Sequence, residues 1–450
     1  MRETILFVIS PAKGHLNASF GLARLFAKRE YSVVYALPFQ LHSHVAEQGF
    51  ECVPLEGLPF GLNAEDTLDY LSRSIGGQSQ RVKYFDNLID RFYDTIYKAR
   101  KTAIERVLQQ TKPNVVLLDS FQSTDFVLLY PFLRQNRVKF AFVQTMLSFH
   151  QQPQSLPLNC AVVPHENTNF GWYWQKHFWK RSFKNALDSV IFLGKSSKQV
   201  IQAKAKEQQL DALYVLSFRQ FARVGFAHIP EFVVAPQALE FAQQKQPNQQ
   251  YLGLMVDLNR KESESCPVFL LLARLAPTQR IVYCSFGTLY ADFGKKKDIL
   301  HFFKVLLKTA IEFPETTFVI NLSESFVKLL DTAPANVHFF EGVPQLTVLA
   351  RSSLFITHGG LNSIQESIAL GVPMLVLPVD KRWDQPGNAA KVVYHGLGLN
   401  GDMAEENTES LSIKINTLIN QSLYRERLLI FKDNVTSLGE EQLLDCLNEV

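Results

Sequence analysis

The sequence predicts an α/β protein built from two doubly wound halves that face each other across a cleft. Three observations lead to this prediction: short apolar runs without polar alternation, amphipathic helical stretches between these runs, and a polar segment near the middle of the chain. Runs rich in Val, Ile and Phe suit parallel strands that are covered on both faces. Where such strands alternate with helices, the expected result is a parallel sheet flanked by helices.

The expected elements fall into two groups. The strands of the first half are predicted at residues 5–9, 31–37, 115–118, 140–143 and 190–192. Those of the second half are predicted at residues 281–285, 317–320, 337–340, 354–357 and 374–377. Amphipathic helical patterns lie at residues 18–28, 299–312 and 364–370.

The alternation weakens between about residues 234 and 278, where a Gln-rich stretch (242–250) and a charged one (260–264) occur. We therefore predict a first domain over residues 1–240, a linker region over 241–278 and a second domain over 279–450. Open α/β sheets bind ligands beyond the carboxyl ends of their strands. Two such halves would place their ligand sites on either side of one cleft.

Composition limits the function classes. A net charge of +3 from 46 basic and 43 acidic residues gives no case for nucleic-acid binding. Five widely spread cysteines without a C-x-x-C pair predict neither a disulfide framework nor a zinc site, so we expect a cytoplasmic protein. The opening apolar run at residues 5–9 is too short for a signal-peptide core, and no apolar run is long enough to span a bilayer.

A glycine turn follows the predicted strand at residues 354–357. Glycines at such a turn let the backbone approach a phosphate, and the N-terminus of the next helix favours negative charge. His358, Asn362 and Glu366 are four residues apart, which places them near one helical face. A donor, an amide and a carboxylate in this order suit a phosphate and a ribose diol. Taken alone, His358 is also typical of a helix start and Glu366 of a solvated helix face.

The segment 342–388 resembles the donor-binding signature of family 1 UDP-glycosyltransferases, which have two Rossmann-like domains in the arrangement called GT-B. The matching motifs, in order, are Val343-Pro344-Gln345, His358-Gly359-Gly360, Asn362-Ser363, Glu366-Ser367, Gly371-Val372-Pro373 and Asp384-Gln385. Residues 384–398 are most similar to bacterial members, including macrolide and carotenoid glycosyltransferases. Residues 282–288 resemble the strand and phosphate loop of the family.

This resemblance implies a role for each matched residue. The diphosphate would be held by the phosphate loop and the glycine turn, at Gly287, Thr288, His358, Gly360, Asn362 and Ser363. The ribose would be bound by Gln345 and Glu366, and uracil by the backbone of Val343. The sugar hydroxyls would be bound by Asp384 and Gln385.

Two positions depart from the family pattern. Gly342 stands where the family has a tryptophan that stacks on uracil. Either another aromatic residue such as Phe339 or Phe340 replaces it, or the base is held more loosely and strict uridine selectivity is lost. Between Pro378 and Asp384 the chain is two residues longer than usual, with Lys381-Arg382 as the extra pair.

His15 is the expected general base, on the loop that follows the first strand. Residues 14–18 resemble the G-H-x-N-P turn of the family, with Ala18 in place of proline. Imidazole, with an unperturbed pKa of about 6.5, suits proton removal from a hydroxyl at neutral pH. Asp119, at the end of another strand, is expected to orient His15, and the resemblance implies attack opposite UDP with inversion. Alternatively, His15 is an ordinary loop histidine and Asp119 a capping residue.

No D-x-D pair occurs in the chain, so we expect neither a metal nor another cofactor. The UDP-sugar would be a co-substrate, and the helix N-terminus with His358 would stabilise the leaving group.

The acceptor side is expected in variable loops of the first domain, including residues 121–130, 144–149 and 156–183. Residues 171–181 hold three of the four tryptophans among basic residues. One interpretation is a peripheral contact with the inner membrane face. The other is an amphipathic helix that packs its aromatic side chains into the core. An aromatic-rich pocket favours small apolar acceptors such as terpenoids, carotenoids, polyketides or phenolics.

The sequence thus predicts an inverting transferase that moves a hexose, with glucose as the expected sugar, to a hydroxyl of a small lipophilic acceptor. Three alternatives stay open: a lipid-linked or glycolipid glycosyltransferase, a non-catalytic UDP-sugar-binding protein, and a UDP-sugar epimerase. An epimerase would need no acceptor, and a binding protein would release no UDP.

Overall fold

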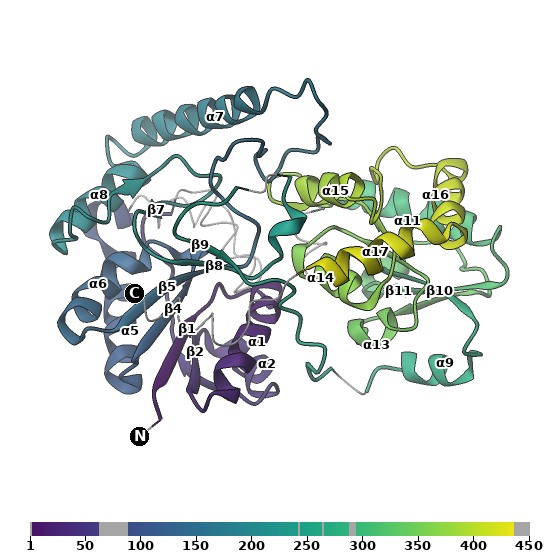
Figure 1. Cartoon of the computed structure of the whole chain (residues 1–450), viewed down its shortest axis with the longest axis horizontal. Coiled ribbons are helices and arrows are strands. Elements are labelled where there is room, and N and C mark those ends of the chain that lie inside the picture. Colours follow the sequence, from purple (N-terminus) through teal and green to yellow (C-terminus); the bar gives the residue numbers. More distant parts are fainter. Residues whose placement is uncertain (1, 63–88, 242–243, 263–264, 288–293, 436–450) are drawn as a thin grey trace.

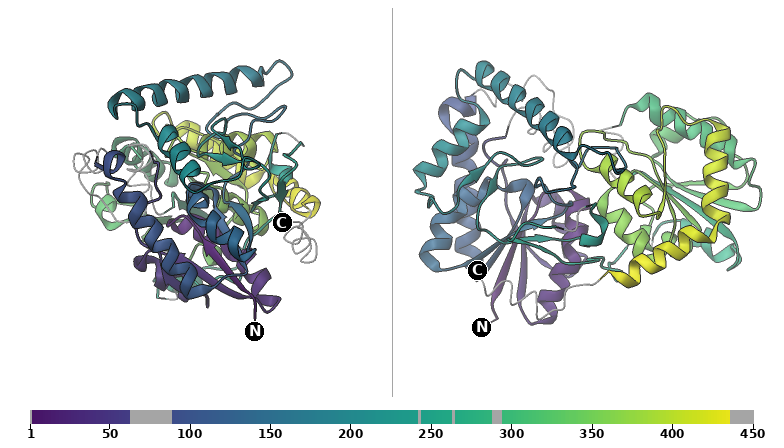
Figure 2. Two further views of the ribbon diagram at one scale, coloured as in Figure 1. Left: turned by 90° about the vertical axis from the view of Figure 1, so that its left-hand side faces the viewer. Right: turned by 45° about the horizontal axis from the view of Figure 1, so that its top comes forward.

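The computed structural model describes residues 2–62, 89–241, 244–262, 265–287 and 294–435, and these residues form two sheets with helices around them (Figure 1). The predicted doubly wound α/β fold is confirmed. In each half the chain starts in the middle of its sheet, builds outward to one edge, and then returns to build the other edge. The two sheets lie side by side, which is clearest in the right-hand view of Figure 2.

The first sheet has the order β3-β2-β1-β4-β5-β8-β9, and every neighbouring pair is parallel. Its strands are β1 (Thr4–Val8), β2 (Ser32–Leu37), β3 (Glu51–Pro54), β4 (Val115–Asp119), β5 (Lys139–Gln144), β8 (Glu231–Val233) and β9 (Gln249–Tyr251). A short antiparallel pair, β6 (Leu216–Ser217) and β7 (Gly225–Phe226), stands apart from it.

The second sheet has the order β12-β11-β10-β13-β14-β15 and is also parallel throughout. Its strands are β10 (Arg280–Ser285), β11 (Thr316–Asn321), β12 (Val337–Phe340), β13 (Leu354–Thr357), β14 (Met374–Val376) and β15 (Gly398–Asn400). The strand order reverses between β1 and β4 in the first sheet and between β10 and β13 in the second. Ligands of doubly wound proteins bind at such reversal points.

Helices cover both sheets. Those of the first half are α1 (Lys13–Lys28), α2 (His42–Ala46), α5 (Thr95–Thr111), α6 (Asp125–Asn136), α7 (Phe170–Ile191) and α8 (Ser197–Glu207). Those that follow are α9 (Val268–Arg274), α11 (Lys296–Ala310), α12 (Glu324–Val327), α13 (Gln345–Leu349), α14 (Leu361–Leu370), α15 (Gln385–Tyr394), α16 (Thr408–Asn420) and α17 (Ser422–Asn434). Short 3-10 turns lie at Phe39–Leu41, Ser120–Gln122 and Gln237–Leu239.

Both faces of each sheet are buried, which explains why the strands show no polar alternation. In β1, Ile5 and Phe7 belong to one apolar cluster and Leu6 and Val8 to another, because successive side chains point to opposite faces. In the second half, the cluster beneath α14 extends into loops of the first half and includes Phe121. The apolar packing is therefore continuous between the two halves.

Three sequence-based expectations about the elements are corrected. The helix expected at residues 18–28 begins at Lys13, because Leu16, like Phe20, is buried against the sheet and its backbone N–H donates to Ala12. Residues 190–192 are not a strand, since α7 runs through to Ile191. Residues 249–251, within the expected linker, form β9 of the first sheet.

The two halves are tied together by the segment that follows β9. Asp257 pairs with Arg24 of α1 at 3.1 Å, and the Lys261 backbone exchanges two hydrogen bonds with the Gln48 side chain. Farther along the junction, the backbone N–H of Gly387 donates to the carbonyl of Leu158. A methyl group at Gly387 would stand 2.1 Å from that carbonyl oxygen, so glycine is required for this close approach.

Candidate active site

His15 and Asp119 lie together at the reversal point of the first sheet. β1 pairs with β4, so the start of α1 and the end of β4 are neighbours. Nδ1 of His15 lies 2.8 Å from Oδ2 of Asp119, and the carboxylate is fully buried. The backbone N–H groups of Ser10 and Phe121 also donate to Asp119, at 3.1 and 2.9 Å. The carboxylate is therefore fixed in place, and it holds one ring nitrogen of His15.

Two further side chains contact His15, and neither is indicated by the sequence motif. The hydroxyl of Thr145, just past the end of β5, lies 2.7 Å from Nδ1 of His15. The ring of Phe121 packs edge-on against the imidazole, with the ring centroids 4.8 Å apart. Thr145 directly follows β5, and Phe121 lies two residues after the end of β4. Polar or aromatic residues just past strand ends of the same sheet edge are the signal that could have identified them.

A cavity of about 520 Å³ lies in the crevice between the halves. Its first-half walls include His15 and Thr145. Its second-half walls contain most of the expected donor residues, namely Gly287, Val343, Gln345, His358, Gly360, Asn362, Ser363, Asp384 and Gln385. Asp119 and Glu366 are fully buried behind the walls, and Thr288 lies outside the described residues. The crevice thus brings the two predicted groups of residues together.

His358 lies at the reversal point of the second sheet, between the ends of β10 and β13 and before α14. Burial lowers the pKa of His358 to about 4, although the backbone of Ser285 acts in the opposite direction. The imidazole is therefore neutral at pH 7 and can donate one hydrogen bond. The N-terminus of α14 adds unpaired backbone N–H groups beside it, as an anion site requires.

Two glycines make room for this ring. A methyl group at Gly360 would lie 2.6 Å from Nε2 of His358, and one at Gly287 would lie 2.9 Å from its Cε1. Gly287 also has a φ of +74°, in the left-handed region that favours glycine. Because both contacts are shorter than van der Waals distances, neither position accepts a side chain without displacing the imidazole.

If His358 binds the diphosphate, as the family resemblance implies, Gly360→Ala is expected to weaken UDP binding by about tenfold, because displacing His358 would remove one hydrogen bond to a charged group. Isothermal titration of UDP checks this. Gly171→Ala is the matched control, since the nearest atom to its added methyl group is 3.7 Å away. Unchanged UDP affinity in Gly360→Ala would mean that His358 does not bind the nucleotide.

Glu366 is fully buried and accepts hydrogen bonds from three side chains. Gln345, which the resemblance assigns to the ribose together with Glu366, donates to it at 2.5 Å, and Asn362 donates at 2.7 Å. The third donor is Arg260, whose Nη1 lies 2.8 Å from the carboxylate. Burial acts to lower the pKa of Arg260, but Glu366 and the nearby Glu262 outweigh this effect and raise it. Arg260 belongs to the segment between the sheets and was not predicted.

Asp384 and Gln385 line the crevice but also brace their own loop. Asn388 donates to the Asp384 carboxylate at 2.8 Å, and the amide oxygen of Gln385 accepts from the backbone N–H groups of Val379 and Asp380. The two extra residues of this loop form ion pairs with other carboxylates: Lys381 with Asp402, and Arg382 with Asp380.

The space beside the expected base site is open. Gly342 has a φ of +71°, and a methyl group there would meet no atom within 4 Å. Phe339 and Phe340 precede it in β12, and both are half-buried. Among the described residues, none therefore packs directly against the position of residue 342.

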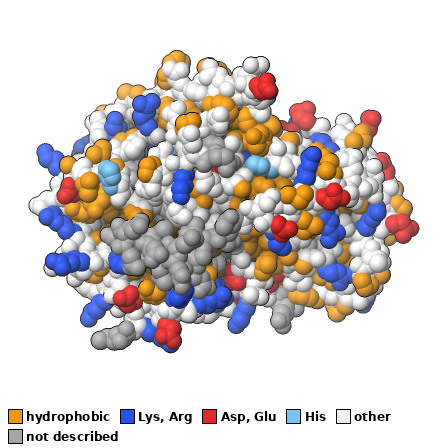
Figure 3. Space-filling view, in the orientation of Figure 1, with side chains coloured by type: hydrophobic (Ala, Val, Ile, Leu, Met, Phe, Trp, Pro, Cys, Tyr) orange, Lys and Arg blue, Asp and Glu red, His pale blue; other side chains and the backbone are white. Residues whose placement is uncertain are grey.

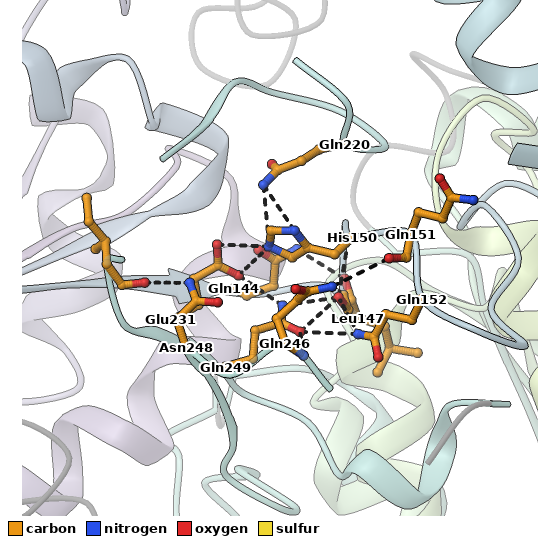
Figure 4. Close-up of polar contacts among 12 residues, drawn as sticks. Gln144, Leu147, His150, Gln151, Gln152, Gln220, Glu231, Gln246, Asn248 and Gln249 are labelled. Atoms are coloured by element: carbon orange, nitrogen blue, oxygen red, sulfur yellow. Dashed lines mark hydrogen bonds and ion pairs between the residues drawn. The ribbon is translucent and has the colours of Figure 1, made fainter. Parts of the chain in front are cut away.

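A second His–carboxylate pair lies away from the crevice, near the end of the first sheet (Figure 4). Nε2 of His150 lies 3.0 Å from both carboxylate oxygens of Glu231, and Gln249 also donates to Glu231 at 2.9 Å. Ser148 bonds to Gln249 in turn. Neither His150 nor Glu231 lines the crevice, so this pair joins β8 and β9 to the chain after β5.

Within the described residues, no group of three or more His, Cys, Asp and Glu side chains is arranged to hold a metal ion. In the same residues no helix is both long and apolar enough to cross a membrane.

Comparison with known protein families gives a match over more than half of the chain. A family model described as UDP-glucoronosyl and UDP-glucosyl transferase matches residues 175–437. The UDP-glucuronosyltransferase 3A2 of Mus musculus is 27% identical over 205 residues, which make up 45% of this chain and 37% of that protein. The uncharacterized UDP-glucosyltransferase YdhE of Bacillus subtilis (strain 168) is 30% identical over 146 residues, 32% of this chain and 35% of that protein. The chain thus spans well under half the length of these relatives.

Solved structures match over the whole chain. The glycotransferase of kitacinnamycin superposes with a TM-score of 0.69 at 19% identity, over 100% of this chain and 98% of that one. Glycosyltransferase VinC, solved in complex with DTDP, superposes with a TM-score of 0.64 at 16% identity, over 99% of this chain and 100% of that one. At these identities the likeness concerns the fold.

Proposed function

Because the chain belongs to the UDP-glucoronosyl and UDP-glucosyl transferase family, we propose that it transfers a sugar from a UDP-sugar to a hydroxyl group of a small acceptor. One observation carries this proposal. In a single crevice, the His15–Asp119 pair of the first half faces the glycine turn, His358 and the α14 N-terminus of the second half. A base and an anion site on opposite walls are what glycosyl transfer from a nucleotide sugar to a hydroxyl requires.

The proposed reaction is a direct displacement. The Nδ1–H group of His15 donates a hydrogen bond to Asp119. The lone pair of Nε2 then accepts the proton of the acceptor hydroxyl. The hydroxyl oxygen forms a bond to the anomeric carbon while the bond from that carbon to the UDP oxygen breaks, which inverts the configuration. Asp119 then stabilises the imidazolium, and His358 with the α14 N-terminus stabilises the charge on UDP.

The donor assignments follow the same geometry. We assign Gln345 and Glu366, which are joined by a hydrogen bond, to the ribose. We assign Gly360, Asn362 and Ser363, at the start of α14, to the diphosphate. We assign the backbone of Val343 to the base, and Asp384 and Gln385 to the hydroxyls of a hexose, with glucose as the first candidate.

We propose a lipophilic acceptor on the basis of the aromatic side chains beside His15. Phe121 contacts both His15 and Trp383, with ring centroids 4.8 and 5.3 Å apart, and Phe221 lies next to Trp383 at 6.3 Å. Trp383 lines both the crevice and a second cavity of about 440 Å³ beneath α7. An apolar acceptor scaffold in the second cavity would present its hydroxyl to His15 past these rings.

The test is a UDP-release screen of several UDP-sugars against lipophilic alcohols and phenols. Acceptor-dependent UDP release, with the glycosylated product identified by mass spectrometry, is the expected result. Saturable UDP binding without release from any acceptor would favour a binding protein. Conversion of the UDP-sugar without an acceptor would favour an epimerase.

Turnover is expected to persist in excess EDTA, because the chain contains no D-x-D pair and the proposed stabilisation of UDP comes from a helix N-terminus and His358. The measurement is the rate of UDP release with and without EDTA, after dialysis against the chelator. A loss of activity that a divalent ion restores would contradict this mechanism.

For the location of the protein we propose a reducing compartment, the cytoplasm. Among the described residues Cys52, Cys160, Cys266 and Cys284 are free thiols, as such a compartment allows.

A further inference from the structure

The helix α7 exposes an apolar stripe that the proposed transfer reaction does not use. Trp179, Phe183 and Val190 are 70%, 71% and 74% exposed, and Trp172 and Leu187 are each 50% exposed. Of the described side chains in this helix, only Trp174 is fully buried. The sequence-based interpretation that α7 packs its aromatic residues into the core is therefore wrong for two of its three tryptophans.

These five residues form one stripe along the helix. At about 100° per residue, their positions fall within an arc of about 80°. We call Trp172, Trp179, Phe183, Leu187 and Val190 the apolar stripe. Lys176 lies within the arc, with its ammonium group 4.9 Å from the Trp172 ring centre, and Lys180 lies at the edge of the arc. The sole acidic residue of α7, Asp188, accepts a hydrogen bond from the Ser197 backbone.

The stripe stands at an outer edge of the molecule. In all the ribbon views α7 lies outside both sheets, and it forms the top of Figure 1. Hydrophobic side chains are exposed along the same upper edge of the space-filling view (Figure 3). The helix has 22 residues and is therefore about 33 Å long, and the turn after it adds Leu193, which is 75% exposed.

We propose that α7 docks in the plane of an anionic phospholipid bilayer, with the apolar stripe in the interface. Helices that lie in a bilayer surface combine a large aromatic and aliphatic face with flanking Lys and Arg. Tryptophan is favoured at the boundary between headgroups and acyl chains. The pattern of α7 meets both conditions, and its lysines complement anionic headgroups.

A second copy of the chain fits the stripe less well. If two copies packed their stripes together, Lys176 and Lys180 of one would meet the same lysines of the other or approach them closely. Described residues of α7 offer no exposed carboxylate on that side to compensate this charge. Charge complementarity therefore favours an anionic surface over self-association.

The side of α7 away from the apolar stripe suggests what the docking would serve, and this step rests on the proposed function. His177 and Arg181, on the side of α7 away from the stripe, line the second cavity, which also reaches Trp383 at the crevice. α7 would thus separate the bilayer surface from the acceptor cavity. A lipophilic acceptor dissolved in the membrane would have only the thickness of this helix to pass.

The test is sedimentation of the whole protein with vesicles of phosphatidylcholine, with and without phosphatidylglycerol. The wild type is expected to bind the anionic vesicles, and Trp172→Ser/Trp179→Ser/Phe183→Ser to bind at least about tenfold more weakly. Lys176→Glu is expected to weaken binding to anionic vesicles only. Ile311→Ser/Ile413→Ser is the matched control, because these residues are 65% and 60% exposed outside α7.

Several outcomes would overturn the docking proposal: no binding of the wild type, equal binding by the triple variant, or a wild-type dimer in velocity sedimentation that the triple variant lacks. An unchanged melting temperature of the triple variant shows that it is folded. UDP release with a water-soluble phenol, without vesicles, tests the transfer reaction separately. Docking without UDP release would leave this inference intact and count against the proposed function.

Discussion

His15→Ala is expected to lower kcat by about 10²–10⁴-fold, the usual contribution of a positioned general base. His15 is held by the buried Asp119 at 2.8 Å and lines the crevice, so it is placed to accept a proton from a bound hydroxyl. Since His15 comes from the first half and the residues that we assign to the nucleotide come from the second, the affinity for UDP should change little. The measurements are kcat from UDP release and UDP affinity from calorimetry.

Two further variants sharpen this experiment. Asp119→Asn keeps the shape of the side chain but loses the charge that stabilises an imidazolium, so kcat should fall while UDP affinity stays the same. His165→Ala removes an exposed histidine before α7 and serves as the control. If His15→Ala retained wild-type turnover, or if its loss of activity were explained by weaker UDP binding, His15 would not be the base.

The strands that the sequence predicted well are those buried on both faces. Residues 281–285 and 354–357 are continuous apolar runs because helices cover both sides of the second sheet. β9 was missed since its burial depends on polar partners: Gln249 is 1% exposed yet bonds to Ser148 and Glu231. Apolar periodicity carries no signal for such a strand. The three-residue strands β8 and β15 contain Glu231 and Asn400, so they lack the continuous apolar run by which the equally short β14 was predicted.

The candidate-site residues that belong to the recognised motifs could be predicted from the sequence. His15 follows β1 and Asp119 ends β4 of the same sheet, so their meeting at its edge follows from topology. Arg260 could not be found in this way, because its contact with Glu366 depends on how the connecting segment passes between the halves. The sequence also did not decide which side of α7 is exposed, because it places apolar residues on more than one side of the helix. Only the packing shows that Trp174 is buried while Trp179 is exposed.

Glu366→Gln is expected to weaken UDP binding by about 10–100-fold and to lower the free energy of unfolding by up to about 3–5 kcal/mol. The first effect is the loss of a charged acceptor for the ribose diol. The second arises because Arg260, nearly buried, would lose the carboxylate at 2.8 Å and keep only Glu262 at 3.5 Å. Titration of UDP and urea unfolding measure the two effects. Glu409→Gln, an exposed glutamate of α16, is the control.

Arg260→Met and the double variant separate nucleotide binding from structural pairing. If Glu366 binds the ribose, Arg260 competes with the ribose for the Glu366 carboxylate. Arg260→Met should therefore keep or increase UDP affinity. It should also lower stability, because the buried carboxylate loses its charged partner. In Arg260→Met/Glu366→Gln both charges of the closest pair are removed, and Glu262 keeps the hydrogen bonds from the backbone N–H groups of Leu346 and Thr347, so stability should recover toward the wild type. UDP affinity should not recover, because the charged ribose ligand is still absent. Recovery of both properties would mean that Glu366 serves only to pair with Arg260, and that the ribose is bound elsewhere in the crevice.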